Sequence, residues 1–151
     1  MFDFNQDIPI GCDHGGFSLK AYLMPTLSSE GYRFKDFGTF SGESVDYPDF
    51  VHPVAKAINE GIYQRGIIIC GSGNGVSIVA NKYPQVRSAV CWREEIAQLS
   101  RLHNNANIIA LPARFISPEE AVNMVKLFFT TDFEKGRHER RVQKIPVPVG
   151  K

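Results

Sequence analysis

The 151-residue sequence lacks the features that mark membrane proteins, polyanion-binding proteins and disulfide-bonded scaffolds. No apolar run approaches the roughly 20 residues that a membrane span needs, and a formal net charge of +1 gives no global attraction for nucleic acid. The three cysteines are odd in number and scattered, which argues against a disulfide framework. Because no basic segment precedes an apolar run at the N-terminus, we expect no signal peptide and a reducing, cytoplasmic setting.

The composition is that of an ordinary globular domain, with 43% hydrophobic and 22% charged residues. We find no internal repeat, linker or low-complexity tract, and 151 residues are too few for two domains. The sequence therefore predicts one domain over residues 1–151.

Short apolar runs alternate with segments of helical spacing along the chain. The predicted strands cover residues 8–12, 33–37, 66–70, 86–92 and 107–111. Pro25 predicts a kink or an early stop in the first helix, and Ser117 with Glu120 forms a capping-box pattern before a later one. This alternation predicts an α/β fold with a five-stranded parallel sheet between two layers of helices. Ligands of such sheets bind beyond the carboxyl ends of the strands.

The third predicted strand ends in a glycine-rich turn, and residues 70–75 read Cys-Gly-Ser-Gly-Asn-Gly. Alternating glycines let backbone amides turn toward one point, and the following helix, predicted over 76–83, adds its positive dipole end. Such a nest stabilises an anion, and the thiolate of an adjoining cysteine becomes more available at neutral pH. A free cysteine is more commonly inert and buried, but the glycine turn favours a functional Cys70.

Two nucleotide-binding motifs compete for this turn, and both fit poorly. The dinucleotide fingerprint needs a glycine where Val76 stands and usually follows the first strand of its unit. The phosphate-binding P-loop needs Gly-Lys-Ser/Thr, which the sequence lacks.

Other strand ends carry titratable residues whose function is open when each is taken alone. Asp13 and His14 follow the first predicted strand, where an Asp cap beside a surface histidine is an equally good interpretation. His103 suits proton exchange near neutral pH but is more often a capping or surface residue. Arg137 and Arg141 share a helix face and form a good phosphate clamp, although a basic run is usually a solvated helix face.

A metal site is not expected from the histidine pattern. The four histidines are far apart in the sequence, with no pair at four-residue spacing and no Cys-x-x-Cys motif.

Together these motifs resemble the B-type ribose-5-phosphate isomerases, which share a family with the galactose- and allose-phosphate isomerases. The resemblance runs from about residue 10 to residue 141 in the family's order. It is carried by residues 11–16 (GCDHGG), 46–48 (DYP), 70–75 (CGSGNG), 80–82 (ANK), 101–104 (RLHN), 106–107 (AN) and 136–138 (GRH), with Ser77 and Arg141.

The resemblance implies a Rossmann-like sandwich, no cofactor, and a homodimer or tetramer with active sites between subunits. The family interconverts an aldose phosphate and its ketose through a cis-enediolate. By the same resemblance, Cys70 takes the C2 proton while turn amides hold the enediolate oxygens, Ser72 relays a proton, and His103 with Asp13 opens the sugar ring. The implied substrate-binding residues are Asp13, His14, Tyr47, Gly71, Ser72, Gly73, Asn74, Gly75, Asn104, Arg114, Arg137 and Arg141, some of them from the partner subunit.

The sequence departs from the family pattern at two turn positions. Asn74 stands where many members carry an apolar residue, and Ser72 stands where threonine is usual. Members without the cysteine are thought to use a glutamate near residues 77–80; none is present here, so Cys70 remains the expected base.

We therefore expect a ribose 5-phosphate isomerase. An isomerase of a four- or six-carbon sugar phosphate, of the allose 6-phosphate or galactose 6-phosphate type, is the close alternative, because the base and the ring-opening residue would be the same. A non-catalytic sugar-phosphate-binding module is the alternative from another class, since it would need the arginines and the glycine turn but not Cys70 with His103.

Overall fold

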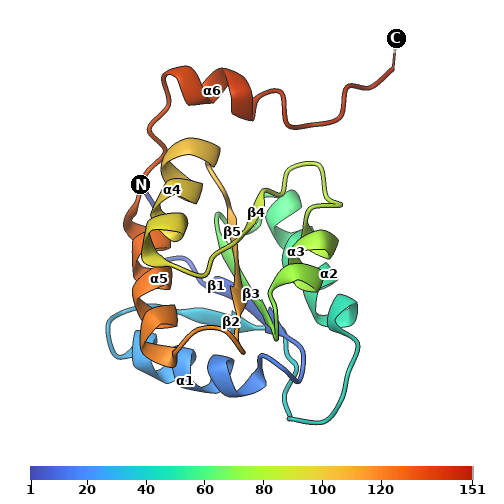
Figure 1. Ribbon diagram of the computed structural model, residues 1–151, viewed down its shortest axis with the longest axis vertical. Helices are drawn as coiled ribbons and strands as arrows, with labels where there is room; N and C mark the ends of the chain where they lie inside the picture. The colour runs from blue at the N-terminus through green and yellow to red at the C-terminus, as the bar shows by residue number, and fades with distance from the viewer. Residues whose placement is uncertain (151) are drawn as a thin grey trace.

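The computed structural model describes residues 1–150 and contains one five-stranded, all-parallel sheet (Figure 1). The sheet order is β2-β1-β3-β5-β4, and neighbouring strands pair in parallel throughout. The strands are β1 (Ile8–Cys12), β2 (Phe34–Asp36), β3 (Gly66–Cys70), β4 (Ser88–Val90) and β5 (Ile108–Pro112). The predicted α/β class and parallel sheet are confirmed, although β2 and β4 are shorter than the predicted runs over 33–37 and 86–92.

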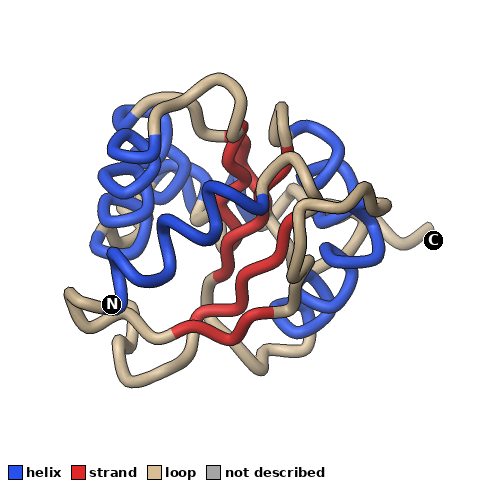
Figure 2. Tube along the Cα trace, turned by 90° about the horizontal axis from the view of Figure 1, so that it is seen from below, coloured by secondary structure: helices blue, strands red, loops and turns tan. Residues whose placement is uncertain are grey.

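Helices cover both faces of this sheet, as the end-on view of Figure 2 shows. One face packs against α1, α4 and α5, and the other against α2 and α3. The helices are α1 (Phe17–Ser28), α2 (Tyr47–Asn59), α3 (Asn74–Ala80), α4 (Glu94–Asn104), α5 (Pro118–Thr130) and α6 (Arg137–Val142). Within residues 1–150, none of the helices is both long and apolar enough to cross a bilayer.

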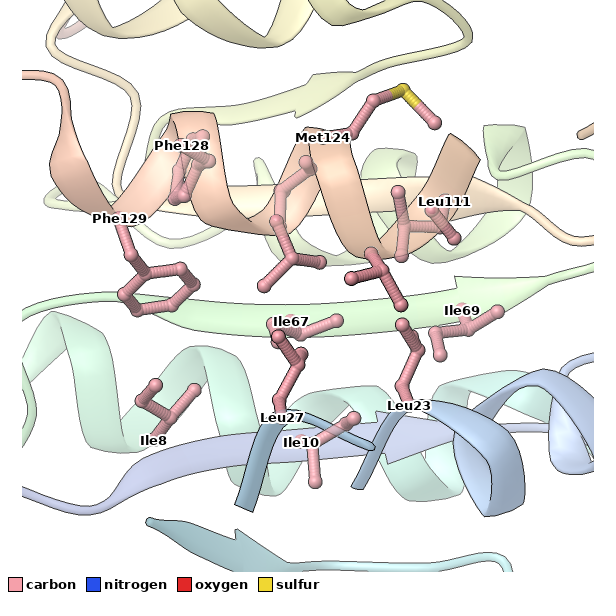
Figure 3. Close-up of a cluster of buried hydrophobic side chains, with 14 of the residues drawn as sticks. Ile8, Ile10, Leu23, Leu27, Ile67, Ile69, Leu111, Met124, Phe128 and Phe129 are labelled. Carbon is pink, nitrogen blue, oxygen red and sulfur yellow. The ribbon is translucent and has the colours of Figure 1, made fainter. Parts of the chain in front are cut away.

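The central position of β3 between two helix layers explains why its sequence shows no alternation of polar and apolar residues. Ile67 and Ile69 point into the core formed with α1 and α5, whereas Ile68 and Cys70 belong to the core under α2 and α3. All three isoleucines are fully buried, as expected for a strand covered on both faces. Figure 3 shows the first core, in which α1 and α5 pack their apolar side chains onto Ile67 and Ile69.

Of the two outcomes predicted at Pro25, a kink or an early stop, the early stop is wrong, because helix α1 runs through Pro25 to Ser28. Proline removes one amide donor from the helix, but Leu23 and Leu27 on either side of it are fully buried. Burying such a leucine contributes about 1.5–3 kcal/mol, which offsets the lost hydrogen bond and keeps the last turn helical.

The structure changes the bounds of one predicted helix, α3, and confirms the predicted start of another, α5. The helix predicted over 76–83 instead spans Asn74–Ala80, because the amides of Lys82 and Tyr83 bond three residues back, to Val79 and Ala80, and tighten the chain into turns. The capping box before α5 is confirmed: the Glu120 amide donates to Ser117 Oγ, and the Ser117 amide donates to the Glu120 carboxylate.

Candidate active site

A small cleft lies where β1, β3 and β5 end, at the carboxyl edge of the sheet. Its volume is about 390 Å³, within the range of small-molecule sites and near its lower limit. The cleft is lined by Asp13, Tyr47, Cys70, Gly71, Ser72, Gly75, Arg114 and Phe115. Seven of these eight residues are predicted site residues; Phe115, whose side chain is 74% exposed, is the one that sequence reasoning missed.

Cys70 is the last residue of β3, and the backbone of the turn is directed at its sulfur. The Gly73 amide donates to Cys70 Sγ over 3.1 Å. Gly73 has φ +74°, a left-handed conformation that favours glycine, so the turn that brings this amide back to the sulfur depends on a glycine there. An amide that donates to sulfur favours negative charge on it.

The other two cysteines lack the environment of a reactive thiol. Cys12 and Cys91 are fully buried in the core beneath α1, α4 and α5. Burial raises the pKa of Cys12 to about 11 and that of Cys91 to about 12, so both remain neutral thiols near pH 7. Of the three cysteines, only Cys70 lines the cleft.

The glycines of the turn permit two close approaches. A Cβ atom on Gly75 would lie 2.7 Å from Cζ of Tyr47, so the tyrosine ring lies against the backbone of the turn. A Cβ atom on Gly71 would lie 3.2 Å from the Arg114 side chain, and the Arg114 amide donates to the Gly71 carbonyl over 3.0 Å. Both side chains are thereby held beside the turn that carries Cys70.

Asp13 and His14 lie in the loop after β1, at the same edge of the sheet. Asp13 is 8% exposed, and its Oδ1 accepts a hydrogen bond from the Gly16 amide; it therefore caps its own turn as well as lining the cleft. His14 Nδ1 accepts from the Val45 amide over 3.2 Å, which leaves Nε2 as the donor of the neutral ring. His14 is partly buried and lies outside the residues that line the cleft.

Asn74 and Ser72 have distinct positions within the turn. The Asn74 amide donates to Ser72 Oγ over 3.3 Å. The side chain of Asn74 is exposed and lines two neighbouring grooves rather than the cleft with Cys70.

The remaining predicted site residues form a second group near the C-terminal end of α4. His103 lies in the last turn of α4, and its ring stacks on that of His138 from α6, with centroids 4.1 Å apart and planes 12° apart. Glu134 Oε2 lies 3.6 Å from Nε2 of each histidine. Burial, followed by the neighbouring His103 and Arg137, lowers the pKa of His138.

This second group lies far from Cys70 within one chain. Helix α4 starts just beyond the carboxyl end of β4 and runs back about 16 Å, the length of its eleven residues. His103 and Asn104 therefore lie near the start of β5, whereas Cys70 pairs with Pro112 at the end of β5. Arg137 and Arg141 are exposed on α6, which Figure 1 shows above the end of α4.

The structure brings together two histidines that are far apart in the sequence. His103 and His138 are 35 positions apart in the sequence but stack directly, because the chain returns from α5 across the end of α4. The positions of Glu134 and His138 beside His103 were not predicted from the sequence. Their own four-residue spacing was the available signal, but nothing in the sequence links them to His103.

Comparison of the whole chain with known proteins identifies one family. The family described as Ribose/Galactose Isomerase matches residues 8–145. Ribose-5-phosphate isomerase B of Escherichia coli (strain K12) is 42% identical over 93% of this chain and 94% of that protein. A D-erythrulose-4-phosphate isomerase of Pectobacterium atrosepticum is 40% identical over 91% of each chain.

Solved structures agree with the sequence comparison. The ribose-5-phosphate isomerase B of Clostridium thermocellum superposes with a TM-score of 0.90 at 48% identity, covering 93% of this chain and 95% of that one. The enzyme of Mycoplasma genitalium with bound ribulose 5-phosphate superposes with a TM-score of 0.88 at 38% identity, covering 92% and 93%. The fold, the glycine turn that ends in Cys70 and these matches over nine-tenths of the chain agree: the chain belongs to the ribose/galactose isomerase family.

Proposed function

We propose that this chain is an aldose–ketose isomerase that interconverts ribose 5-phosphate and ribulose 5-phosphate through a cis-enediolate. The hydrogen bond from the Gly73 amide to Cys70 Sγ, at a residue that lines the cleft, is the observation that supports this most directly. A thiolate stabilised in this way is a suitable base for a proton next to a carbonyl group. The relative with bound ribulose 5-phosphate supports the choice of a pentose.

In the proposed reaction, Cys70 removes the proton from C2 of the open-chain aldose and returns it to C1. Negative charge then develops on the oxygens at C1 and C2, where backbone amides stabilise it most effectively. The Gly73 and Asn74 amides already donate within the turn, to Cys70 Sγ and Ser72 Oγ. We therefore assign the enediolate oxygens to the amides of Gly71, Ser72 and Gly75, with the Ser72 hydroxyl as the proton relay.

We also propose that each active site combines residues of two chains. The cleft around Cys70 has Asp13, Tyr47 and Arg114 from its own chain, but α4 holds His103 and Asn104 at the other end of the sheet. In a two-fold symmetric dimer, one subunit's second group can approach the other subunit's cleft, and symmetry then completes two identical sites. His103 would open the sugar ring with Asp13, and Tyr47 and Asn104 would bind sugar hydroxyls.

Exposed apolar side chains support this assembly. Phe115 at the rim of the cleft is 74% exposed, Trp92 is 52% exposed and Ile78 on α3 is 61% exposed. After α6 the chain passes above the connection between α3 and β4 (Figure 1), and Val147 and Val149 in this segment are almost fully exposed. Apolar surface of this kind is typical of an interface that a partner covers.

We assign the phosphate of the substrate to basic residues on α6 of one chain and to basic residues near the cleft of the other. Arg137 and Arg141 are four residues apart on α6 and share a face, so they form a two-pronged clamp for a dianion. His14 and Arg114 approach from the other chain. The proposed phosphate site is thus built from side chains of two copies of this chain.

The three free cysteines also bear on location. Unpaired thiols persist in a reducing compartment, which supports our proposal that the enzyme works in the cytoplasm.

Replacing Cys70 by alanine tests the proposed base. Because a positioned base contributes roughly 10²–10⁴-fold, we expect Cys70→Ala to lower kcat for ribose 5-phosphate by that factor while substrate binding largely survives. Cys91→Ala, which removes a thiol from the core, is the matched control and should keep kcat per folded molecule. A Cys70→Ala enzyme within a few-fold of wild type would contradict the role of Cys70, and normal sugar-phosphate binding by a wild-type protein without turnover would favour the non-catalytic module.

Replacing Arg137 by alanine tests the phosphate clamp. Losing one prong of a charge-assisted contact should raise KM for ribose 5-phosphate by about tenfold or more, since such bonds contribute about 1.5–3 kcal/mol. Arg140→Ala, on the same helix and equally exposed, controls for the loss of one positive charge. Equal KM values for the two variants would remove Arg137 from the clamp.

The length of the sugar is tested by steady-state kinetics on a panel of aldose phosphates. A four-carbon substrate is the second candidate, because the D-erythrulose-4-phosphate isomerase is nearly as similar to this chain as the Escherichia coli enzyme is. We expect kcat/KM to be highest for ribose 5-phosphate. A comparable or higher kcat/KM on a four- or six-carbon sugar phosphate would overturn the pentose assignment and leave the isomerase assignment intact.

A further inference from the structure

His103, Glu134 and His138 form a cluster of three side chains that are chemically suited to bind a metal ion. One ligand atom from each lies within 4.8 Å of the other two. Glu134 Oε2 is 3.6 Å from both histidine Nε2 atoms, a separation too long for a hydrogen bond. The three polar groups therefore lie close together without satisfying one another.

His138 supplies a second and independent observation. Its side chain is 9% exposed, and its Nε2 atom is fully buried with no hydrogen-bond partner among the residues that the structure describes. A buried polar atom without a partner costs about 1–3 kcal/mol and calls for a physical explanation. Nε2 of His138 faces Glu134 and His103, so a ligand placed between the three would satisfy it.

We infer that His103, Glu134 and His138 form a binding site for a divalent cation of the Zn²⁺ class. Two imidazoles and one carboxylate are a ligand set that zinc uses with an open fourth position. Zn–N and Zn–O bonds of about 2.0–2.2 Å require ligand atoms closer together than they are here. The stacked rings must also turn so that their lone pairs converge, and the ring of His103, 38% exposed, has room to do so.

The charges around the cluster determine how firmly it holds a cation. Glu134 is the one carboxylate in the cluster, and Arg137 and Arg141 lie close enough to perturb His138 electrostatically. Positive charge next to a cation weakens its binding. We therefore expect a site that gains and loses its ion reversibly rather than a permanently occupied structural site.

Occupancy of this site has a consequence that rests on the proposed function. A metal bound to Nε2 of His103 takes the lone pair that ring opening requires, so the loaded enzyme should turn over the cyclic aldose more slowly. The cation would act as a reversible inhibitor, and the effect would reach the cleft of the second chain, to which His103 contributes.

Metal binding is tested on untagged, chelator-treated full-length protein titrated with Zn²⁺ by calorimetry and with Co²⁺ by visible absorption. We expect one ion per chain and Co²⁺ bands typical of tetrahedral nitrogen and oxygen ligands. Glu134→Gln should weaken binding at least about tenfold, because changes beside metal ligands alone cost 10–100-fold. Glu139→Gln removes a neighbouring exposed carboxylate and should bind normally. Equal affinity in Glu134→Gln and wild type, or no Co²⁺ bands in wild type, would overturn the site.

The Cys70→Ala variant tests whether Zn²⁺ binds at the histidine cluster or at the Cys70 thiol, which is the other candidate ligand. Unchanged Zn²⁺ affinity in this variant supports the histidine cluster, and lost affinity contradicts it. In the activity assay, added Zn²⁺ should inhibit wild type and Glu139→Gln equally and Glu134→Gln only at concentrations at least about tenfold higher. A protein that binds Zn²⁺ as described but shows no isomerase activity would refute the proposed function and leave the metal site standing.

Discussion

The hydrogen bond from the Gly73 amide to Cys70 Sγ is the contact on which the proposed chemistry depends. It forms because β3 is buried on both faces and ends at the edge of the sheet, so that its last residue is rigidly held beside a cleft. The left-handed Gly73 then turns the chain back on the sulfur. The fold thus supplies a fixed thiol and a fixed donor at the same point.

The position of each cysteine in the fold explains why one differs from the other two. Cys12 and Cys91 lie in the hydrophobic core, and burial raises the pKa of each. Cys70 is also buried, at 5% exposure, but it lines the cleft and its sulfur accepts from the Gly73 amide. What sets Cys70 apart from the other two cysteines is therefore its position at the cleft.

Much of the fold and half of the site could be predicted from the sequence because they depend on local patterns. The unbroken isoleucines of β3 predict a strand buried on both faces, and the glycines after it predict the turn at Cys70. The continuation of α1 past Pro25 could not be predicted, because the burial of Leu23 and Leu27 offsets the missing amide donor. The pairing of His103 with His138 depends on how α6 crosses α4, which no local pattern encodes. The family resemblance names residues from both ends of the sheet, but it does not say which of them one chain can bring together.

The central claim is that Cys70 of one chain works with His103 of another, and mixing two inactive variants tests it most directly. Cys70→Ala and His103→Ala proteins are denatured together in equal amounts and refolded, so that hybrid dimers form. Each hybrid then has one site with both native residues, and activity should recover to about a quarter of wild type, as random pairing in a two-fold dimer predicts. If both residues served the same chain's site, every site would carry a lesion and the mixture would remain as inactive as either variant alone.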